Sequence, residues 1–134
     1  MNYIDSWILI ELFLEGEKAE KVLHLLEKIR KERIVMSAIA LFELKYHLTK
    51  KSGKERTEQI LAVLEQIEEV AIAPILSQTC LLAAELRLKY YTKERQISVA
   101  DALHLATAMQ TGCKAFYSGD PDFQNIEEIE TVIV

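Results

Sequence analysis

Acidic side chains occur at several places in this chain where the neighbouring residues are apolar. Carboxylates that their neighbours half-bury repel one another and resist ionisation unless a cation compensates their charge. If the fold brings them together, the simplest compensation is a divalent metal with oxygen ligands. The sequence therefore predicts metal-dependent chemistry on a phosphate ester. The acids concerned are Asp5, Glu43, Asp101 and the pair Asp120 and Asp122.

The segments that must position these acids alternate between strands and helices. Apolar runs separated by amphipathic stretches predict right-handed crossovers, and hence a mostly parallel sheet with helices on both faces. Ser37, Ser77 and Ser98 are each expected to cap a helix. The expected strands are Tyr3–Ile4, Arg33–Met36, Val70–Ile72, Lys114–Tyr117 and Thr131–Val134.

Several of the candidate residues follow an expected strand directly. Active sites of parallel sheets gather beyond the carboxyl ends of the strands. Asp5, Ser37 and Asp120 come at or just after such ends, and Asp101 is the third residue of the helix that Ser98 precedes. The positions of the acids therefore agree with a site at one edge of the sheet.

Each acid alone also has an ordinary structural interpretation. Asp5 and Asp101 could satisfy free N–H groups at helix starts, and Ser98 and Asp101 have the spacing of a capping box. Glu43 could lie on a solvent-exposed helix face, and Asp120–Asp122 could be a plain turn. The joint placement of all of them favours a site, because the structural interpretation requires a separate coincidence for each.

Composition indicates a globular protein with one domain over residues 1–134. Half of the residues are apolar, and the net charge of -5 argues against binding nucleic acid by bulk attraction. This charge does not exclude a nuclease, since a bound metal carries its own positive charge. Cys80 and Cys113 have no zinc-like spacing, and they fit a reducing cytoplasm. We expect no membrane segment, because no apolar stretch is long enough.

Four segments together resemble one family, the PIN-domain ribonucleases, and within it the VapC-type toxins of toxin–antitoxin pairs. The most specific part is an Asp-Ala-Leu helix start followed by a strand and an acidic turn. The segments are Tyr3–Ser6 (YIDS), Phe42–Leu44 (FEL), Ser98–Ala108 (SVADALHLATA) and Ser118–Phe123 (SGDPDF).

The resemblance implies a three-layer α/β sandwich and an endoribonuclease that depends on Mg²⁺ or Mn²⁺. It also implies a homodimer and a small antitoxin protein that covers the site. By the same resemblance Asp122 would be an auxiliary acid, and Ser6 and Ser118 would position water or stabilise the acidic cluster. The metal ligands that it implies are Asp5, Glu43, Asp101 and Asp120.

The chain departs from the family pattern at Gly119, Pro121 and His104. His104 stands where an aliphatic residue is usual, and it either points towards the site or bonds to a backbone group. Because the acids have no basic partner near them in the sequence, we expect hydrolysis by a metal-activated water without a histidine base.

Basic residues outside the acid cluster would hold the RNA through its phosphates. Aliphatic residues at Leu41, Leu44 and Leu48 could form part of a dimer surface. The two basic groups are Lys45, Lys50, Lys51, Lys54 and Arg56, and Arg87, Lys89, Lys93 and Arg95.

Two other functions agree less well with this sequence. A haloacid-dehalogenase-type phosphatase uses a strand-end Asp and Mg²⁺, but it needs a second Asp where this chain has Trp7. A non-catalytic PIN-like interaction module would have no reason to keep a set of costly carboxylates. Both are therefore less favoured than a nuclease.

Overall fold

The computed structural model describes residues 1–134 and is built on a five-stranded sheet with the order β3-β2-β1-β4-β5. All neighbouring strands are parallel, and the central strand pairs Tyr3 with Val35 on one side and with Phe116 on the other. The predicted strands are therefore present, within a residue or two at their ends. They are β1 (Asn2–Ile4), β2 (Ile34–Ser37), β3 (Val70–Ala73), β4 (Ala115–Ser118) and β5 (Glu130–Ile133).

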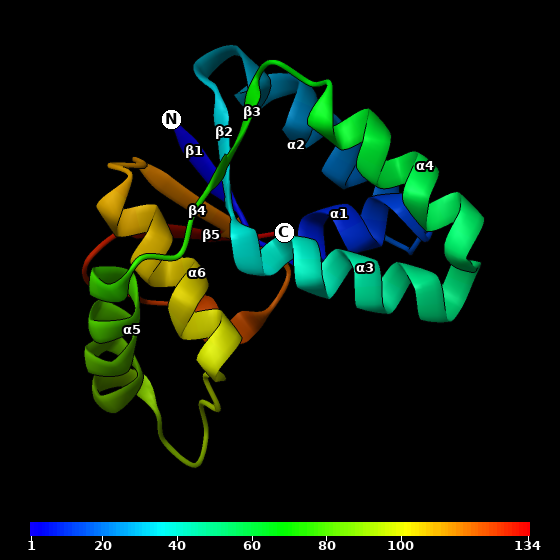
Figure 1. Ribbon diagram of the computed structural model, residues 1–134. Coiled ribbons are helices and arrows are strands. Elements are labelled where there is room, and N and C mark those ends of the chain that lie inside the picture. Colours follow the sequence, from blue (N-terminus) through cyan, green and yellow to red (C-terminus); the bar gives the residue numbers. More distant parts are fainter.

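Helices cover both faces of the sheet, as Figure 1 shows. Helices α1–α4 pack on one face, and α5 and α6 pack on the other. The three-layer sandwich with a parallel central sheet is thus confirmed. The helices are α1 (Ser6–Phe13), α2 (Ala19–Ile29), α3 (Ala38–Ser52), α4 (Lys54–Glu65), α5 (Ser77–Tyr90) and α6 (Val99–Gln110), with short 3₁₀ turns η1 (Arg30–Glu32) and η2 (Pro121–Phe123).

The alternation of side chains along β1 divides the interior into two cores. Tyr3 points into the core beneath α5 and α6, and Ile4 points into the core beneath α1–α4. Both side chains are almost fully buried, and burial of a side chain of this size contributes roughly 2 kcal/mol. Because β1 is fixed from both faces, the residue that follows it, Asp5, has a well-defined position.

Two expectations about the helices need correction. Ser77 does not cap α5: the cap position is Leu76, whose N–H donates to Thr79 Oγ1 at 3.1 Å. Leu44 and Leu48 do not form an exposed face, because both are fully buried in the core beneath α1–α4.

No helix has both the length and the apolar character needed to cross a membrane.

Candidate active site

Asp5 lies at the centre of the candidate site, between the end of β1 and the start of α1. It occupies the N-cap position of α1 but its side chain makes no capping hydrogen bond. Instead Ser118 Oγ, at the end of the adjacent strand β4, donates to Asp5 Oδ2 at 2.6 Å. Asp5 Oδ1 is buried and has no hydrogen-bond partner. The capping interpretation is therefore wrong for Asp5, and one of its oxygens is left for another partner.

The surroundings of Asp5 oppose its ionisation. Its pKa is raised from an ordinary 3.8 to about 7; burial is the main cause, and the negative charges of Asp101 and Glu43 contribute to the rise. The hydrogen bond from Ser118 acts in the opposite direction. Only 4% of Asp5 is exposed, so water cannot compensate the charge. A cation beside the free oxygen would do so.

Glu43 reaches the same region from the first half of α3, and a histidine holds it. His104 Nε2, from α6, lies 2.5 Å from Glu43 Oε1. Burial alone would raise the pKa of Glu43, but hydrogen bonds from His104 and Ser6 outweigh this and lower it. Glu43 is half-buried. The interpretation of Glu43 as a plain solvent-face residue is therefore wrong.

Two alternatives were expected for His104, and the structure favours the one in which it points towards the site. Its ring is almost fully buried, and neither ring nitrogen bonds to a backbone group. It connects two side chains instead, Glu43 and Tyr3. The position of His104 one helical turn after Asp101 indicated that it could reach the site, but not which residues it would bond to.

Asp101 is both a capping residue of α6 and a member of the acid cluster. It forms a capping box with Ser98, in which Asp101 N donates to Ser98 Oγ at 3.1 Å and Ser98 N donates to Asp101 Oδ2 at 3.0 Å. Burial raises its pKa, and the negative charge of Asp120 adds to the rise. The cap therefore fixes the orientation of an acid that faces the other acids.

The turn after β4 is organised by successive hydrogen bonds. Asp120 N donates to Ser118 Oγ at 3.0 Å, and Asp122 N donates to Asp120 Oδ1 at 2.9 Å. Asp122 lies on the rim, where it lines a polar hollow of about 550 Å³ together with Lys89 and Arg95. Asp120 is close enough to the site for its negative charge to raise the pKa of Asp101, and Asp122 lies further out.

Trp7 packs against this turn and explains the glycine in it. A Cβ atom on Gly119 would lie 2.2 Å from the Trp7 ring, closer than any real contact. The indole therefore occupies the place of a side chain at position 119. Trp7 is the only tryptophan of the chain, and it lies between the segments that carry Asp5 and Asp120.

The structure brings the acids to one end of the sheet, but their side chains do not form a complete metal-binding site. No three His, Cys, Asp or Glu side chains are arranged as a group that could hold a metal ion as they stand. The negative charges of Glu43 and Asp101 raise the pKa of Asp5, and the negative charge of Asp120 raises the pKa of Asp101. The residues fit a hard cation in chemistry, since all are oxygen donors and one buried oxygen of Asp5 has no partner.

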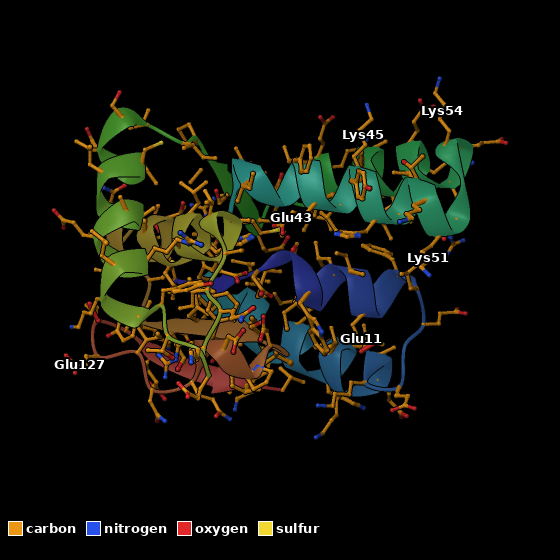
Figure 2. The ribbon with its side chains drawn as sticks, turned by 90° about the horizontal axis from the view of Figure 1, so that it is seen from below. Glu11, Glu43, Lys45, Lys51, Lys54 and Glu127 are labelled. Atoms are coloured by element: carbon orange, nitrogen blue, oxygen red, sulfur yellow. The ribbon has the colours of Figure 1, made fainter.

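The two predicted basic groups differ in their availability. Lys89 Nζ is bound by Glu127 Oε2 at 2.9 Å and by Glu128 Oε2 at 3.3 Å, and the Arg87 guanidinium stacks over Tyr91. In Figure 2, Lys45 and Lys54 point away from the molecule, whereas Glu43 lies on the inner side of α3. In the group on α3 and α4, Lys54 Nζ lies 3.9 Å from Glu58 Oε1 and Arg56 donates to the Phe13 carbonyl at 3.5 Å, so these contacts are longer than those of Lys89.

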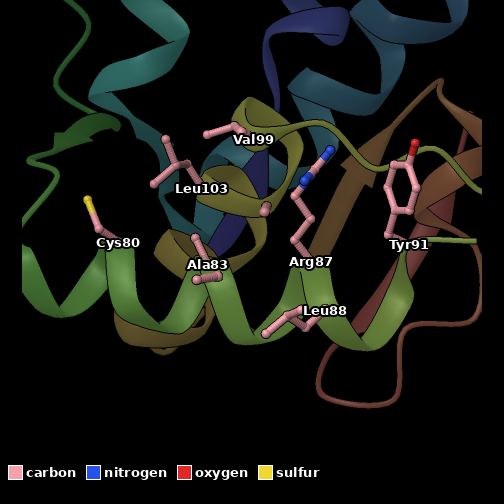
Figure 3. A pocket seen from close by; sticks show the side chains of 9 residues that line it. Cys80, Ala83, Arg87, Leu88, Tyr91, Val99 and Leu103 are labelled. Atoms are coloured by element: carbon pink, nitrogen blue, oxygen red, sulfur yellow. The ribbon is translucent and has the colours of Figure 1, made fainter.

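An apolar groove of about 670 Å³ runs between α5 and α6, beside the site. Figure 3 shows Leu88 of α5, Tyr91 directly after α5, and Val99 and Leu103 of α6 along it. The Leu88 side chain is 84% exposed. The groove is adjacent to Asp101, because Ala102 and Leu103, the next two residues of α6, line it.

Comparison with protein families gives one match that spans nearly the whole chain. Residues 3–129 match the model of the PIN domain. The chain is a PIN domain. A comparison with curated proteins by sequence finds no match.

Solved structures share the fold of this PIN domain at low sequence identity. VapC20 of Mycobacterium tuberculosis, described as a Sarcin-Ricin loop cleaving toxin, has a TM-score of 0.81 and 18% identity, over 97% of this chain and 98% of its own. VapBC2 of Rickettsia felis, bound to a promoter DNA fragment, gives 0.78 and 21%, over 98% of both chains. FitAcB of Neisseria gonorrhoeae gives 0.75 and 22%, over 98% of this PIN domain and 96% of its own chain.

Proposed function

We propose that this PIN domain is a metal-dependent endoribonuclease and the toxin of a type II toxin–antitoxin pair. The observation that carries the proposal is Asp5: a buried carboxylate with a free oxygen and a pKa raised to about 7, within the electrostatic reach of Glu43 and Asp101. A carboxylate in that state is expected where a cation completes the site. Similarity to VapC20, which is described as a Sarcin-Ricin loop cleaving toxin, supports the substrate class.

Asp5, Glu43, Asp101 and Asp120 would hold the cation, Mg²⁺ or Mn²⁺. When bound, it supplies the positive charge that neutralises the scissile phosphate and acidifies a nucleophilic water. Ser118 fixes one oxygen of Asp5, and the capping box fixes Asp101. Asp122 would act at the rim as an auxiliary acid. Cleavage would leave 5′-phosphate and 3′-hydroxyl ends.

The outer surface of α3 is the part of the molecule best suited to hold RNA. Phe42 is 66% exposed and stacks on Tyr46, with ring centroids 6.1 Å apart, and Lys50 lies over the Tyr46 ring. Exposed aromatic rings stack with bases, and neighbouring lysines contact phosphates. Because Phe42 precedes Glu43, this surface begins at the proposed catalytic site.

A small antitoxin is the proposed protein partner, in the cytoplasm. A similar solved structure, from Klebsiella pneumoniae with 22% identity and a TM-score of 0.70, is described as a toxin–antitoxin complex. We also propose a homodimer, which the exposed apolar groove between α5 and α6 supports. The surface expected at Leu44 and Leu48 plays no part in it, because the chain itself buries both residues.

Cleavage of total RNA with purified protein, with and without Mn²⁺, tests the proposed function. We expect Mn²⁺-dependent cleavage by the wild type, and a loss of about two orders of magnitude or more in Asp5→Asn, as follows from removing a group on which charge stabilisation depends. Glu85→Gln, an exposed acid on α5 with apolar neighbours, is the matched control and should cut normally. Equal cleavage by wild type and Asp5→Asn would refute the assignment. Absence of any cleavage would favour the interaction module.

A further inference from the structure

We propose that His104 and Tyr3 are positioning residues for Glu43, and that Tyr3 selects the tautomer in which His104 presents an N–H to the Glu43 carboxylate. The inference rests on the proposed function for its role in metal binding, but its hydrogen-bond chain can be tested without metal. Neither residue contacts the substrate in this proposal. Both act through Glu43.

The two residues belong to a continuous hydrogen-bond chain through the interior. It starts at the backbone N–H of Ser37, which donates to the Tyr3 hydroxyl at 3.0 Å. The hydroxyl lies 2.6 Å from His104 Nδ1, and His104 Nε2 lies 2.5 Å from Glu43 Oε1. The chain therefore joins the end of β2 to a carboxylate of the site through two side chains that are almost fully buried.

Donor and acceptor counting gives this chain a direction. The Tyr3 oxygen accepts from Ser37 N–H, and His104 Nδ1 is the only other partner of the hydroxyl. The phenolic proton must point to that nitrogen, because a buried O–H without an acceptor is costly. His104 Nδ1 is then an acceptor, so the ring carries its proton on Nε2 and donates it to Glu43.

The chain is suited to holding Glu43 in place rather than to moving protons to a substrate. The Glu43 side chain is long and rotates freely unless it is fixed, and a donor 2.5 Å away on a packed helix fixes one of its oxygens. Partners of metal-binding carboxylates orient them, and their removal commonly weakens metal affinity about 10–100-fold. The ring edge of His104 also packs against Tyr3 in a T-shaped contact, which limits its rotation.

The tautomer is measured first, on metal-free protein, by long-range ¹H–¹⁵N correlation of the imidazole. We expect the signals of a neutral ring with its proton on Nε2 in the wild type. In Tyr3→Phe we expect a mixture of tautomers, since the donor to Nδ1 is gone. A ring with its proton on Nδ1, or a tautomer unchanged by Tyr3→Phe, would overturn the proposed role of Tyr3.

Affinity for Mn²⁺ is measured next, by calorimetry and by quenching of the fluorescence of Trp7. We expect His104→Leu, which fills the same space, to weaken binding about 10–100-fold. His104→Gln, whose amide can still donate to Glu43, should recover most of the loss, and Tyr3→Phe should fall between. Thr107→Val is the matched control: Thr107 is buried on the same helix, but its hydroxyl bonds only to the Leu103 carbonyl. It should bind as the wild type does, whatever its effect on stability.

The outcomes separate the two proposals. If the wild type binds Mn²⁺ and Asp5→Asn does not, but His104→Leu binds as tightly as the wild type, the positioning role is wrong and the proposed function stands. If Thr107→Val weakens binding as much as His104→Leu, the effect is general loosening of α6 and the positioning role is again wrong. If the wild type itself binds no Mn²⁺, both are wrong. Should His104→Leu fail to fold, His104→Gln and Tyr3→Phe still decide the matter.

Discussion

The two oxygens of the Asp5 carboxylate have different surroundings, and this difference is the main support for the proposed metal site. One accepts a hydrogen bond from Ser118, a residue 113 positions away in the sequence, and the other has no partner. The type and position of Asp5 could be predicted, because it follows a short apolar strand. Its unsatisfied oxygen could not, because that depends on contacts between distant segments.

The raised pKa of Asp5 predicts a particular dependence of stability on pH. The unfolded chain releases this proton near 3.8, whereas the folded protein keeps it until about 7. The folded state therefore binds more protons between these values, and the free energy of unfolding should fall as pH rises through the interval, by an amount on the order of a few kcal/mol.

Urea unfolding with a chelator present, at about pH 5 and about pH 8, measures this dependence. Asp5→Asn should flatten it and be more stable than the wild type at the higher pH, because the amide carries no charge to bury. A variant much less stable than the wild type at both pH values would mean that Asp5 serves the fold instead.

At the scale of elements, periodicity and cap residues were sufficient to predict most strands and helices. The parallel sheet followed from the alternation of those elements. What could not be predicted are contacts between elements, such as His104 with Glu43, which are 61 residues apart. The space that Trp7 takes from position 119 is another such contact. Local patterns indicated that positions 104 and 119 are unusual, but not which distant residues they contact.

The start of α6 gives a prediction at this scale, with the start of α5 as its control. Ser98→Ala removes a side-chain cap and should lower the free energy of unfolding by about 1 kcal/mol. It should change Mn²⁺ binding far less than Asp5→Asn does, because the Asp101 carboxylate accepts from the Ser98 backbone N–H, which the substitution keeps. Ser77→Ala should be nearly neutral, since Ser77 lies one residue beyond the cap position of α5. Equal losses in both variants, measured by urea unfolding, would contradict the assigned caps.

At the scale of the whole molecule, the acid cluster at the end of the sheet lies beside the apolar groove between α5 and α6. The sequence indicated an excess of apolar surface, and of the residues expected there Leu41 is exposed. Leu44 and Leu48 are in the core, whereas Leu81, Leu88 and Val99 are exposed. The distinction depends on which helix faces meet the sheet, and two adjacent helices on one face hide each other only in part.

The groove predicts self-association of the purified protein. Sedimentation velocity over a wide range of concentration should show a dimer for the wild type and a monomer for Leu88→Asp. The substitution places a charge on a side chain that is 84% exposed in the single chain, so the melting temperature of the monomer should change little. A wild type that stays monomeric at every concentration would contradict a dimer through this surface.

The acids at the end of the sheet are proposed to bind one hard cation together. Anomalous diffraction from a crystal of the protein soaked in Mn²⁺ can locate that ion without reference to activity. We expect a peak in contact with Asp5 Oδ1 and at least one oxygen of Glu43, Asp101 or Asp120, and no such peak in Asp5→Asn. Mn²⁺ bound only elsewhere on the wild-type protein, or a peak that persists unchanged in Asp5→Asn, would contradict it.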